Sequence, residues 1–519
     1  MISNFIFTSM IFDIAIIGFG VIGVELVSEI IKVKNKKNIK ILILEKDINN
    51  IPGGVAYSKV TSKYGFFNNP LRLSNPEFAK WIKKNQYKLI RYIKQKNEDW
   101  LNDWLGKNKK ILNNRRKSFD EIYFPRLAYS LFLQNKIKNI IKLLNKKKIN
   151  LFFFNGDLIN ISQNNNLICK TKDKSYKILI NYKFNKLKIK KTNKYIKFFN
   201  SKNIVLGNGL LPPADIGNYN IKNNKNYIWD FYSEGGTLNL IKKIKEKIKK
   251  KKLFRIVFIG NKAGLLETMP ELLKLSKKLN QKIKIVSISP TLETLEKAEF
   301  SNKFSNFKFK YLNPSKILDI KKSSQILNLL KKEFKYAVAN GYNKYDVWTW
   351  ALKKDIIKKC YSQLSIKEKY TYNQKIFSKI RNITRYTYPN TIYAREKLEN
   401  YKTLTYIKDK VVKLSNNGKY IKIHTKQGKV IKSDIVINVS GPEKLNPDKN
   451  QNKLINSIIK MNLNYNERGF IADKDFCIGK NIYAPGILSS NFNPHRYTII
   501  KAVTMNCKYS ARKILKKIS

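Results

Sequence analysis

The chain has 519 residues, of which 43% are hydrophobic and 12% aromatic, and its formal net charge is +68. This composition is typical of a globular protein and not of a disordered one. The length predicts two or three domains, because one core seldom serves so long a chain. No stretch is apolar over a length that would span a bilayer, and the first residues lack the basic leader and cleavage site of a signal peptide.

The positive charge is almost all lysine, scattered among asparagine and isoleucine along the chain, as the codon bias of an AT-rich genome would produce. Arginine, which contacts phosphates and bases in a bidentate manner, is scarce. The densest run, IKKIKEKIKKKKLFR at 241–255, is typical of a solvated helix before a strand. We therefore expect no specific nucleic-acid partner, only weak polyanion binding that salt removes.

Metal and disulfide chemistry are not indicated. The four cysteines are far apart and form no CxxC pair, and there are two histidines: Cys169, Cys360, Cys477, Cys507, His424 and His495. Isolated thiols suit a reducing compartment, so we expect a cytoplasmic protein. We predict neither a zinc site nor another metal site.

From the N-terminus, the first clear pattern is a strand–turn–helix–strand unit. A hydrophobic strand at 14–17 runs into GFGVIG (18–23), a helix follows, and a second strand, IKILILE, ends at Glu45. Short connections of this kind predict a parallel sheet. Residues 1–9 precede the strand and are expected to be a loose extension.

The glycine motif indicates a dinucleotide site. We expect Gly18 to form the tight turn, Gly20 to let a diphosphate approach the backbone, and Gly23 to let the helix pack on the strand. The phosphates would face the N–H groups at the helix start. Glu45, 22 positions after Gly23, is placed to accept a hydrogen bond from a ribose hydroxyl. The alternative is a glycine-rich turn of purely structural use.

The segment IPGGVAYS at 51–58 extends this predicted surface as a turn, because glycine allows close approach to the backbone. Downstream, Asn68 and Asn69 carry amides that suit the edge of a flavin. The alternatives are a plain turn and Asn-Pro turn chemistry. Residues 75–150 hold helix formers and three tryptophans, which predict helices packed on the sheet.

A second, weaker nucleotide motif follows. Residues 151–205 predict short strands that end in NIVLGNGLLPP, and a new strand–helix–strand pattern starts at 253 with LFRIVFIGNKAGLLE. Here Gly260 and Gly264 keep their places, but Lys262 stands where the middle glycine belongs. A lysine there would crowd a diphosphate, although its ammonium would partly compensate by charge.

The strand after this motif leaves the choice of nucleotide open. It carries Ser287 and Ser289, not the arginine that usually holds a 2′-phosphate. We therefore leave NAD(P)H binding at this site, and the choice between NADH and NADPH, undecided.

The C-terminal part returns to sheet and ends in a helix. Residues 320–400 are helical and aromatic in pattern, strand alternation resumes at 420–442, and NIYAPG (481–486) precedes the last helix. We expect Asn493 to cap that helix with Pro494 at its first position. The helix N-terminus would then face the flavin ring and stabilise negative charge on it. The first turn would hold His495, Arg496 and Thr498; for His495 a cap or surface role is the alternative.

In this order the segments resemble a known family. The matching segments are GFGVIG, GGVAYS, the asparagine pair with Trp81, YFPRLAYSLFL (123–133), IVLGNGLLPP, RNITRYTYP, VINVSGPE and NIYAPG. Together they resemble the FAD/NAD(P)-binding proteins grouped with FAD-dependent urate hydroxylase-like enzymes and nitrosuccinate-forming L-aspartate N-monooxygenases. They span residues 12–515, although the family usually has alanine or threonine before the glycine of GNG.

The resemblance implies a two-domain α/β flavoprotein, similar to the glutathione-reductase-type FAD/NAD(P)-binding fold. We predict an FAD-binding domain made of residues 1–240 and 431–519, with an NAD(P)-like, substrate-facing domain inserted at 241–430. The residues that we expect to contact FAD are Gly18, Phe19, Gly20, Val21, Ile22, Gly23, Glu45, Lys46, Gly53, Gly54, Val55, Ala56, Tyr57, Asn68, Asn69, Gly207, Asn208, Gly209, Gly486 and Thr498. The second nucleotide would contact Gly260, Lys262 and Gly264.

The resemblance also implies an FAD-dependent oxidoreductase. We expect a flavin monooxygenase that uses NAD(P)H and O2 on a small polar substrate, such as an amino acid or a purine-like molecule. The alternatives are a flavin dehydrogenase or oxidase without oxygen insertion, and a non-catalytic FAD-binding redox module. The catalytic residues stay unknown, with Arg385, His495 and Arg496 as candidates. The arginines that are candidates for holding an acidic substrate are Arg72, Arg126, Arg385 and Arg496, with structural salt bridges or cofactor-phosphate contacts as the alternative.

Overall fold

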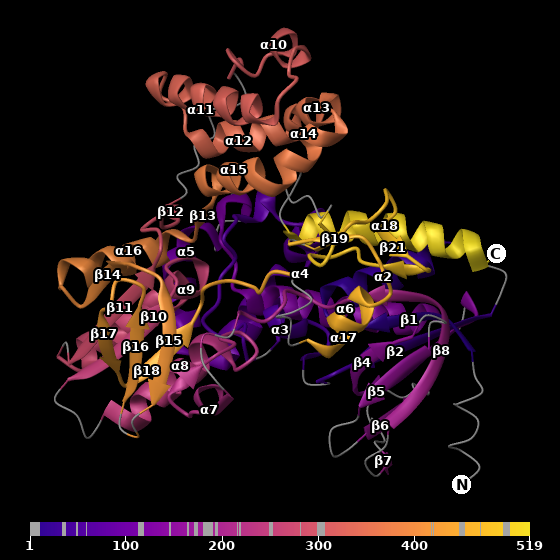
Figure 1. Ribbon diagram of the computed structural model, residues 1–519, viewed down its shortest axis with the longest axis horizontal. Coiled ribbons are helices and arrows are strands. Elements are labelled where there is room, and N and C mark those ends of the chain that lie inside the picture. Colours follow the sequence, from indigo (N-terminus) through magenta and orange to yellow (C-terminus); the bar gives the residue numbers. More distant parts are fainter. Residues whose placement is uncertain are drawn as a thin grey trace.

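The computed structural model describes residues 11–518, apart from 34–37, 48–49, 59, 113–118, 145–146, 163–165, 171–174, 180–189, 193–195, 215, 217–218, 249–252, 281, 298–306, 417, 419, 446–451, 468 and 491–498. Two sheets lie side by side, and a cluster of helices stands apart from both (Figure 1). The expected extension at 1–9 and the expected cap at 493–494 lie outside the described residues.

The first sheet has the strand order β21-β22-β8-β1-β2-β3-β6-β7. Its centre is parallel: β1 pairs with both β2 and β8, and β2 pairs with β3. The predicted strand–helix–strand unit is therefore confirmed, with α2 connecting β1 to β2. The strands and this helix are β1 (Ile11–Ile17), α2 (Val21–Lys32), β2 (Ile39–Glu45), β3 (Ile149–Asn155), β4 (Asp157–Ile161), β5 (Asn166–Lys170), β6 (Ser175–Leu179), β7 (Lys190–Thr192), β8 (Ile196–Leu206), β21 (Cys477–Gly479) and β22 (Ile482–Tyr483).

Helices cover one face of this sheet, as the sequence pattern predicts. Their apolar sides and the sheet form one core, in which Trp100 and Trp104 are buried and Trp81 is half-buried. The longest of them begins at Pro76 because the Asn75 side chain accepts hydrogen bonds from the first backbone N–H groups. The helices are α4 (Pro76–Lys96), α5 (Asp99–Leu112), α6 (Arg126–Leu144) and α18 (Ile499–Ile518). The other face packs on α17 (Lys453–Ile459).

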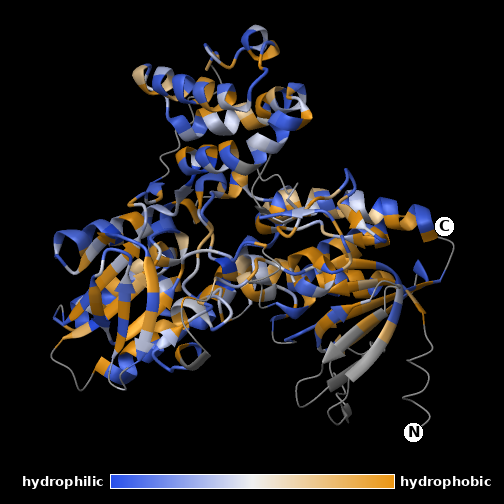
Figure 2. Cartoon of the chain, viewed as in Figure 1, coloured by the Kyte–Doolittle hydropathy of each residue, from blue (hydrophilic) through white to orange (hydrophobic). Residues whose placement is uncertain are grey.

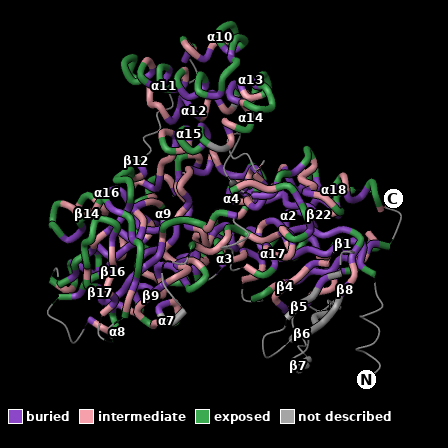
Figure 3. Tube along the Cα trace, in the orientation of Figure 1, coloured by how far each residue is buried: buried purple, intermediate pink, exposed green. Residues whose placement is uncertain are grey.

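The second sheet has the order β14-β11-β10-β18-β9, and its pairs are all parallel. One face is covered by three helices and the other by the antiparallel strands β15, β16 and β17. Its strands are hydrophobic and buried, like those of the first sheet (Figures 2 and 3). The elements are β9 (Tyr227–Ile228), α8 (Gly236–Ile248), β10 (Phe254–Ile259), α9 (Ala263–Lys278), β11 (Ile283–Ser289), α16 (Pro389–Asn400), β14 (Leu404–Lys408), β15 (Val411–Asn416), β16 (Ile421–Thr425), β17 (Val430–Ser433) and β18 (Ile435–Asn438).

This topology bears on two sequence predictions. The lysine-rich run at 241–255 contributes residues 241–248 to α8 and its last two residues to the start of β10, which confirms the predicted helix before a strand. The domain limits at 240/241 and 430/431 stay a prediction. Strands β9 and β18 pair within the second sheet but lie just outside the predicted insertion.

The helical cluster has a hydrophobic core of its own. A short parallel pair, β12 (Glu296–Lys297) with β13 (Tyr386–Thr387), lies at its base. The sequence predicts helices at 320–400 but does not show that most of them form a separate unit. The elements are α10 (Pro314–Leu318), α11 (Ser323–Ala339), α12 (Lys344–Lys353), α13 (Ile356–Gln363), α14 (Ile366–Thr371), a π-helical turn (Tyr372–Ile376) and α15 (Phe377–Thr384). In the described part of the chain, no helix combines the length and apolar character that crossing a membrane requires.

Candidate functional site

The first glycine loop joins β1 to α2 as predicted. Gly18 has φ +92°, a backbone conformation that glycine adopts without strain. A Cβ at Gly23 would lie 2.7 Å from the Gly18 carbonyl oxygen, so this glycine lets the helix pack against the loop. Helix α2 begins after Gly20 and has no side-chain cap. Its first N–H groups therefore form a site that suits an anion.

Glu45 lies at this loop. Its Oε2 accepts a hydrogen bond from the Phe19 N–H at 2.7 Å, and its Oε1 accepts one from Asp47 N–H at 3.1 Å. Burial raises the pKa of Glu45 above the ordinary value, while these N–H bonds act against the rise. The side chain thus lies where the sequence predicts, with a carboxylate beside the bare backbone of the loop.

Gly20 lies close to the segment 53–54. A Cβ on Gly20 would lie 3.1 Å from the Gly54 Cα. Gly54 itself has φ +59°. The close contact between these two backbones is one reason for glycine at position 20, and its predicted role beside a diphosphate stays a prediction.

Two further segments reach the same place. Gly207 follows β8, and a Cβ there would lie 2.5 Å from the Gly18 carbonyl oxygen. A Cβ at Gly486 would lie 2.3 Å from the Ile22 side chain. Next to them, the buried Asn208 Oδ1 has no hydrogen-bond partner among the described residues. Gly209 differs, since a Cβ there would meet open space.

These features fit a dinucleotide. The fit rests on backbone N–H groups at the start of α2, on a carboxylate for a sugar hydroxyl, and on the orphaned Asn208 oxygen. They gather at the carboxyl ends of β1 and β8, the edge of a parallel sheet where such ligands bind. The Lys46 ammonium pairs with Asp157 at 2.9 Å, and its predicted contact with the cofactor stays a prediction.

Tyr57 corrects our interpretation of the segment GGVAYS as a surface turn. The segment forms a short helix, α3 (Gly54–Tyr57), with Val55 and Ala56 exposed. The Tyr57 ring stacks on Phe67, with the centroids 5.9 Å apart. Burial raises the pKa of its hydroxyl to about 12. Its side chain therefore serves the core next to the glycine loop.

Asn68 and Asn69 connect the first region to β13. The Asn68 side-chain oxygen accepts a hydrogen bond from the Thr387 hydroxyl at 3.2 Å, and the Asn69 oxygen accepts one from Tyr386. The RYTYP segment that carries these partners was recognised in the sequence, but their contact with the asparagines was not. The roles of both asparagines toward a flavin stay a prediction.

The candidate arginines fall into two groups. Arg72 pairs with Glu121 at 2.7 Å and with Asp346 at 3.4 Å. Arg126 binds both oxygens of Glu267, at 2.8 and 3.3 Å. Both are therefore ion-pair residues, whereas Arg385 has no ion pair or side-chain hydrogen bond within the described ranges. His495, Arg496 and Thr498 lie outside those ranges.

Arg126 is a residue whose role the sequence did not reveal. It begins α6 in the first region, while Glu267 lies on α9 of the second, so their ion pair joins the two regions. Burial tends to lower the pKa of Arg126, but Glu267 raises it overall. The Arg126 Nε also donates to the Phe66 carbonyl oxygen at 3.3 Å. The pair therefore fixes the loop that continues to Asn68 and Asn69.

The second glycine loop keeps its turn but not its middle glycine. Gly260 has φ +112°, and a Cβ at Gly264 would lie 2.6 Å from the Val439 side chain. Lys262 caps α9 with φ −105°, a conformation that does not require glycine. Its ammonium lies 3.4 Å from the Asn382 side-chain oxygen and 4.0 Å from Glu293.

The serines on β11 are turned inward. Ser287 is buried and donates to the Gly260 carbonyl oxygen at 3.2 Å, and Ser289 is buried as well. They support the turn of the second loop. Neither offers the charge that would select a 2′-phosphate.

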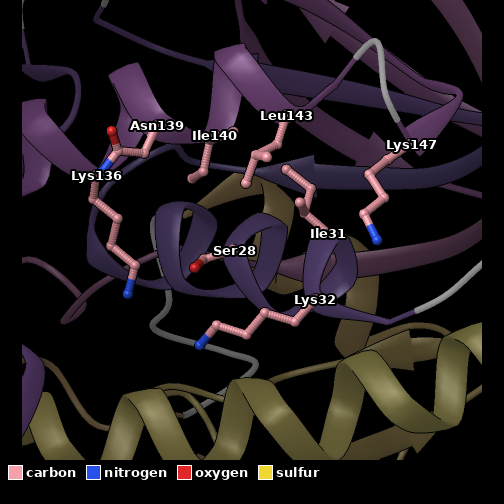
Figure 4. Close-up of a pocket in the computed structure, with 8 residues that line it drawn as sticks. All are labelled: Ser28, Ile31, Lys32, Lys136, Asn139, Ile140, Leu143 and Lys147. Carbon is pink, nitrogen blue, oxygen red and sulfur yellow. The ribbon is translucent and has the colours of Figure 1, made fainter.

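A pocket of about 350 Å³ lies elsewhere, between α2 and α6 (Figure 4). Two of its three lysines are already neutralised, because Lys136 pairs with Glu25 at 2.9 Å and Lys32 pairs with Glu29 at 2.5 Å. It is lined from the C-terminal half of α2, away from the glycine loop, and we assign it to helix packing. Its lining residues are Ser28, Ile31, Lys32, Lys136, Asn139, Ile140, Leu143 and Lys147.

Comparison with known protein families agrees with the first of these sites. Residues 15–178 match the family described as FAD-NAD(P)-binding. This segment contains the first glycine loop, Glu45 and both asparagines. The first part of the chain is thus of the FAD/NAD(P)-binding type, as predicted. No curated protein matches the chain in sequence.

Solved structures agree on the fold. The chain is similar to an ornithine N-hydroxylase, KtzI, from Kutzneria sp. 744, with a TM-score of 0.53 and 11% identity over 98% of this chain and 100% of that one. It is also similar to DfoA, a cadaverine monooxygenase from Erwinia amylovora solved with FAD, with a TM-score of 0.50 and 11% identity over 98% of this chain and 95% of that one.

These likenesses confirm the predicted fold class, an α/β flavoprotein fold of the FAD/NAD(P)-binding kind. Neither structure is a urate hydroxylase-like enzyme or an L-aspartate N-monooxygenase, and the finer resemblance drawn from motif order stays a prediction. The likeness to the FAD-NAD(P)-binding family covers residues 15–178, and over the rest of the chain the solved structures show similarity of fold.

Proposed function

We propose that this chain is an FAD-dependent oxidoreductase, specifically a flavin monooxygenase that takes electrons from NAD(P)H and uses O2 to oxygenate a small polar substrate. The observation that carries this proposal is the meeting of four chain segments at the carboxyl ends of β1 and β8, where Glu45 lies beside bare backbone. One similar structure is an ornithine N-hydroxylase and the other is a cadaverine monooxygenase bound to FAD, which supports the same type of activity.

Each part of the site has a role in this proposal. The N–H groups at the start of α2 would hold the diphosphate, Glu45 would hold a ribose hydroxyl, and Asn208 would donate or accept at the third segment. When bound, FAD supplies the redox chemistry, and the protein supplies binding, orientation and exclusion of water. The second glycine loop would hold the nicotinamide nucleotide, and the substrate would lie where the regions meet.

One observation favours a second candidate, a flavoprotein that does not use a nicotinamide donor. Lys262 replaces the middle glycine of the second loop, and its side chain lies toward Asn382 and Glu293. A loop altered in this way would hold a dinucleotide less closely, so a redox module or a different electron donor would be consistent with it.

Absorbance measurements on the purified protein distinguish these candidate functions. We expect it to retain FAD, visible as a yellow absorbance, and to lose this colour under nitrogen when NADPH or NADH is added. Reoxidation by air with oxygen transferred to a small polar substrate, instead of released as H2O2, would support a monooxygenase. A colourless protein that cannot be reconstituted with FAD would refute the proposal. Retained FAD that neither nucleotide reduces would favour the second candidate.

A further inference from the structure

Arg385 lies where the helical cluster meets the first region. It is the residue between α15 and β13. The next two residues bind the first region, because Tyr386 and Thr387 donate to Asn69 and Asn68. On the other side, the Arg385 carbonyl oxygen accepts a hydrogen bond from the Tyr345 hydroxyl of α12 at 3.5 Å. Its main chain is therefore held from both sides at the base of the helical cluster.

The guanidinium of Arg385 lacks the partner that comparable arginines have. Arg72, Arg126 and Arg395 are also half-buried, and each pairs with a carboxylate. Arg381 is half-buried without a carboxylate among the described residues, but its guanidinium lies over the Phe377 ring. Arg385 has no such ion pair and no side-chain hydrogen bond within the described ranges. Partial burial alone, with no acid nearby, lowers its pKa. Removing a charge from water without a counter-ion costs free energy, so this arrangement suits a residue that receives its anion from a ligand.

The acids around this junction are already in use. Asp346 pairs with Arg72, Glu296 pairs with Lys344 and accepts from Tyr345 at 2.7 Å, and Glu293 accepts from Asn382 at 2.8 Å. Arg385 therefore has no counter-ion among these acids. The loop that carries Asn68 and Asn69, which we call the asparagine loop, connects this junction to the cofactor site. A planar guanidinium binds a carboxylate through two parallel hydrogen bonds.

Building on the proposed function, we propose that Arg385 binds a carboxylate of the substrate, so that the substrates of this protein are small carboxylic acids. Arg385 would then be a specificity-determining residue, with the uncharged part of the substrate directed toward the asparagine loop. The same fork could hold a phosphate of the nicotinamide nucleotide, and the experiment must separate these two anions.

The test is a binding titration of the FAD-loaded protein by calorimetry. The probes are C3 to C6 mono- and dicarboxylates, each compared with its neutral amide, such as succinate with succinamide. We expect the wild-type protein to bind at least one acid and not its amide. Arg385→Gln should weaken that binding by about tenfold or more, and Arg385→Lys by less, because lysine keeps the charge but loses the bidentate geometry.

Arg381→Gln is the matched control. Arg381 lies one turn earlier on α15, over the Phe377 ring at 5.5 Å, and the substitution removes the same charge. It should leave acid binding within about twofold, since the Arg381 guanidinium is directed to the Phe377 ring. Thermal unfolding of each variant verifies that it is folded, and Arg385→Lys provides a second variant if Arg385→Gln does not fold.

The outcomes are distinct. If Arg385→Gln weakens NADP+ binding and leaves acid binding unchanged, the residue binds the nucleotide and the inference is wrong. It is equally wrong if the folded wild-type protein binds no acid of the panel. If the protein binds no FAD but still binds an acid through Arg385, the carboxylate site stands and the proposed flavin function fails.

Discussion

The two glycine loops of this protein share a plan and differ in one position. In both, a parallel strand ends in a glycine with positive φ, Gly18 at +92° and Gly260 at +112°, and a helix begins three residues later. The first loop has Gly20 in the middle, pressed against Gly54, while the second has Lys262, whose side chain reaches Asn382. The two loops thus share the geometry of the turn but differ in the contacts of the middle residue.

This difference indicates what each loop is built to do. The first is enclosed by segments 53–54 and 207–208 and has Glu45 at the end of the next strand. The second has no acid at the end of β11, where Ser289 stands. Both loops have a neighbouring segment against their first glycine, Gly207 at Gly18 and Val439 at Gly260, so the acid and the segment 53–54 are what distinguish the first loop. An added carboxylate for a sugar hydroxyl suits a cofactor that stays bound.

The largest effect is expected where the regions that carry the two loops are joined. Arg126→Met removes one partner of a buried ion pair and leaves the Glu267 carboxylate without its counter-ion. We expect the free energy of unfolding to fall by about 3–5 kcal/mol. Chemical denaturation measures it, with Arg91→Met as the control, since Arg91 is exposed. A double variant, Arg126→Met with Glu267→Leu, should recover part of the loss of stability. If the double variant loses as much stability as Arg126→Met alone, the two residues do not act as a pair.

Gly20→Val tests whether the middle position of the first loop requires glycine. A branched side chain would meet the Gly54 backbone at about 3.1 Å, and such overpacking costs about 1–3 kcal/mol. We expect the folded variant to be purified without FAD. Lys262→Val, the equivalent change in the second loop, should keep both FAD and stability, because position 262 already holds a side chain. A yellow Gly20→Val protein would contradict this account.

The sequence predicts the local parts of both loops and misses the contacts between distant segments. Glycine spacing and the strand that ends at Glu45 are local signals, so the turn and the carboxylate could be placed. The contact of Gly20 with Gly54, the packing of Tyr57 on Phe67 and the pairing of Arg126 with Glu267, 141 positions apart, depend on tertiary packing. The helical cluster is also missed, because an amphipathic pattern shows that a helix is buried but not which core it joins.

A smaller effect is expected at the carboxylate of the first loop. Glu45→Gln should weaken FAD binding by about tenfold, or about 1.4 kcal/mol, since it replaces a charged acceptor by a neutral one. Burial raises the pKa of Glu45, so this carboxylate becomes protonated at a higher pH than an ordinary glutamate does. The FAD affinity of the wild-type protein should therefore begin to fall at that higher pH. The variant should lack this fall, and equilibrium dialysis at several pH values measures both.

Acidification should have the opposite effect on the FAD-free protein, because protonation of Glu45 should increase its free energy of unfolding. A carboxyl group whose pKa is raised by folding opposes folding above that pKa, and the penalty disappears as the pH falls through it. The difference in unfolding free energy between Glu45→Gln and wild type should therefore shrink on acidification. A difference that grows instead would place the raised pKa on another group.

The smallest effect is expected in the second loop, where the two loops differ most in sequence. Lys262→Gly restores the pattern of the first loop and removes an ammonium that is partly exposed and lies at the edge of hydrogen-bonding distance from its neighbours. Exposed charges contribute little and are screened by salt, so the Kd for NADP+ should change by less than about fivefold. The sign should depend on ionic strength: at low salt the variant loses attraction to the diphosphate, and at high salt the relief of crowding should dominate. Fluorescence titration with NADP+ at two salt concentrations would reveal this crossing. A loss of binding at both would instead make Lys262 the main anchor of the nucleotide, and the second loop would then be a lysine-based site of its own and not a weakened copy of the first.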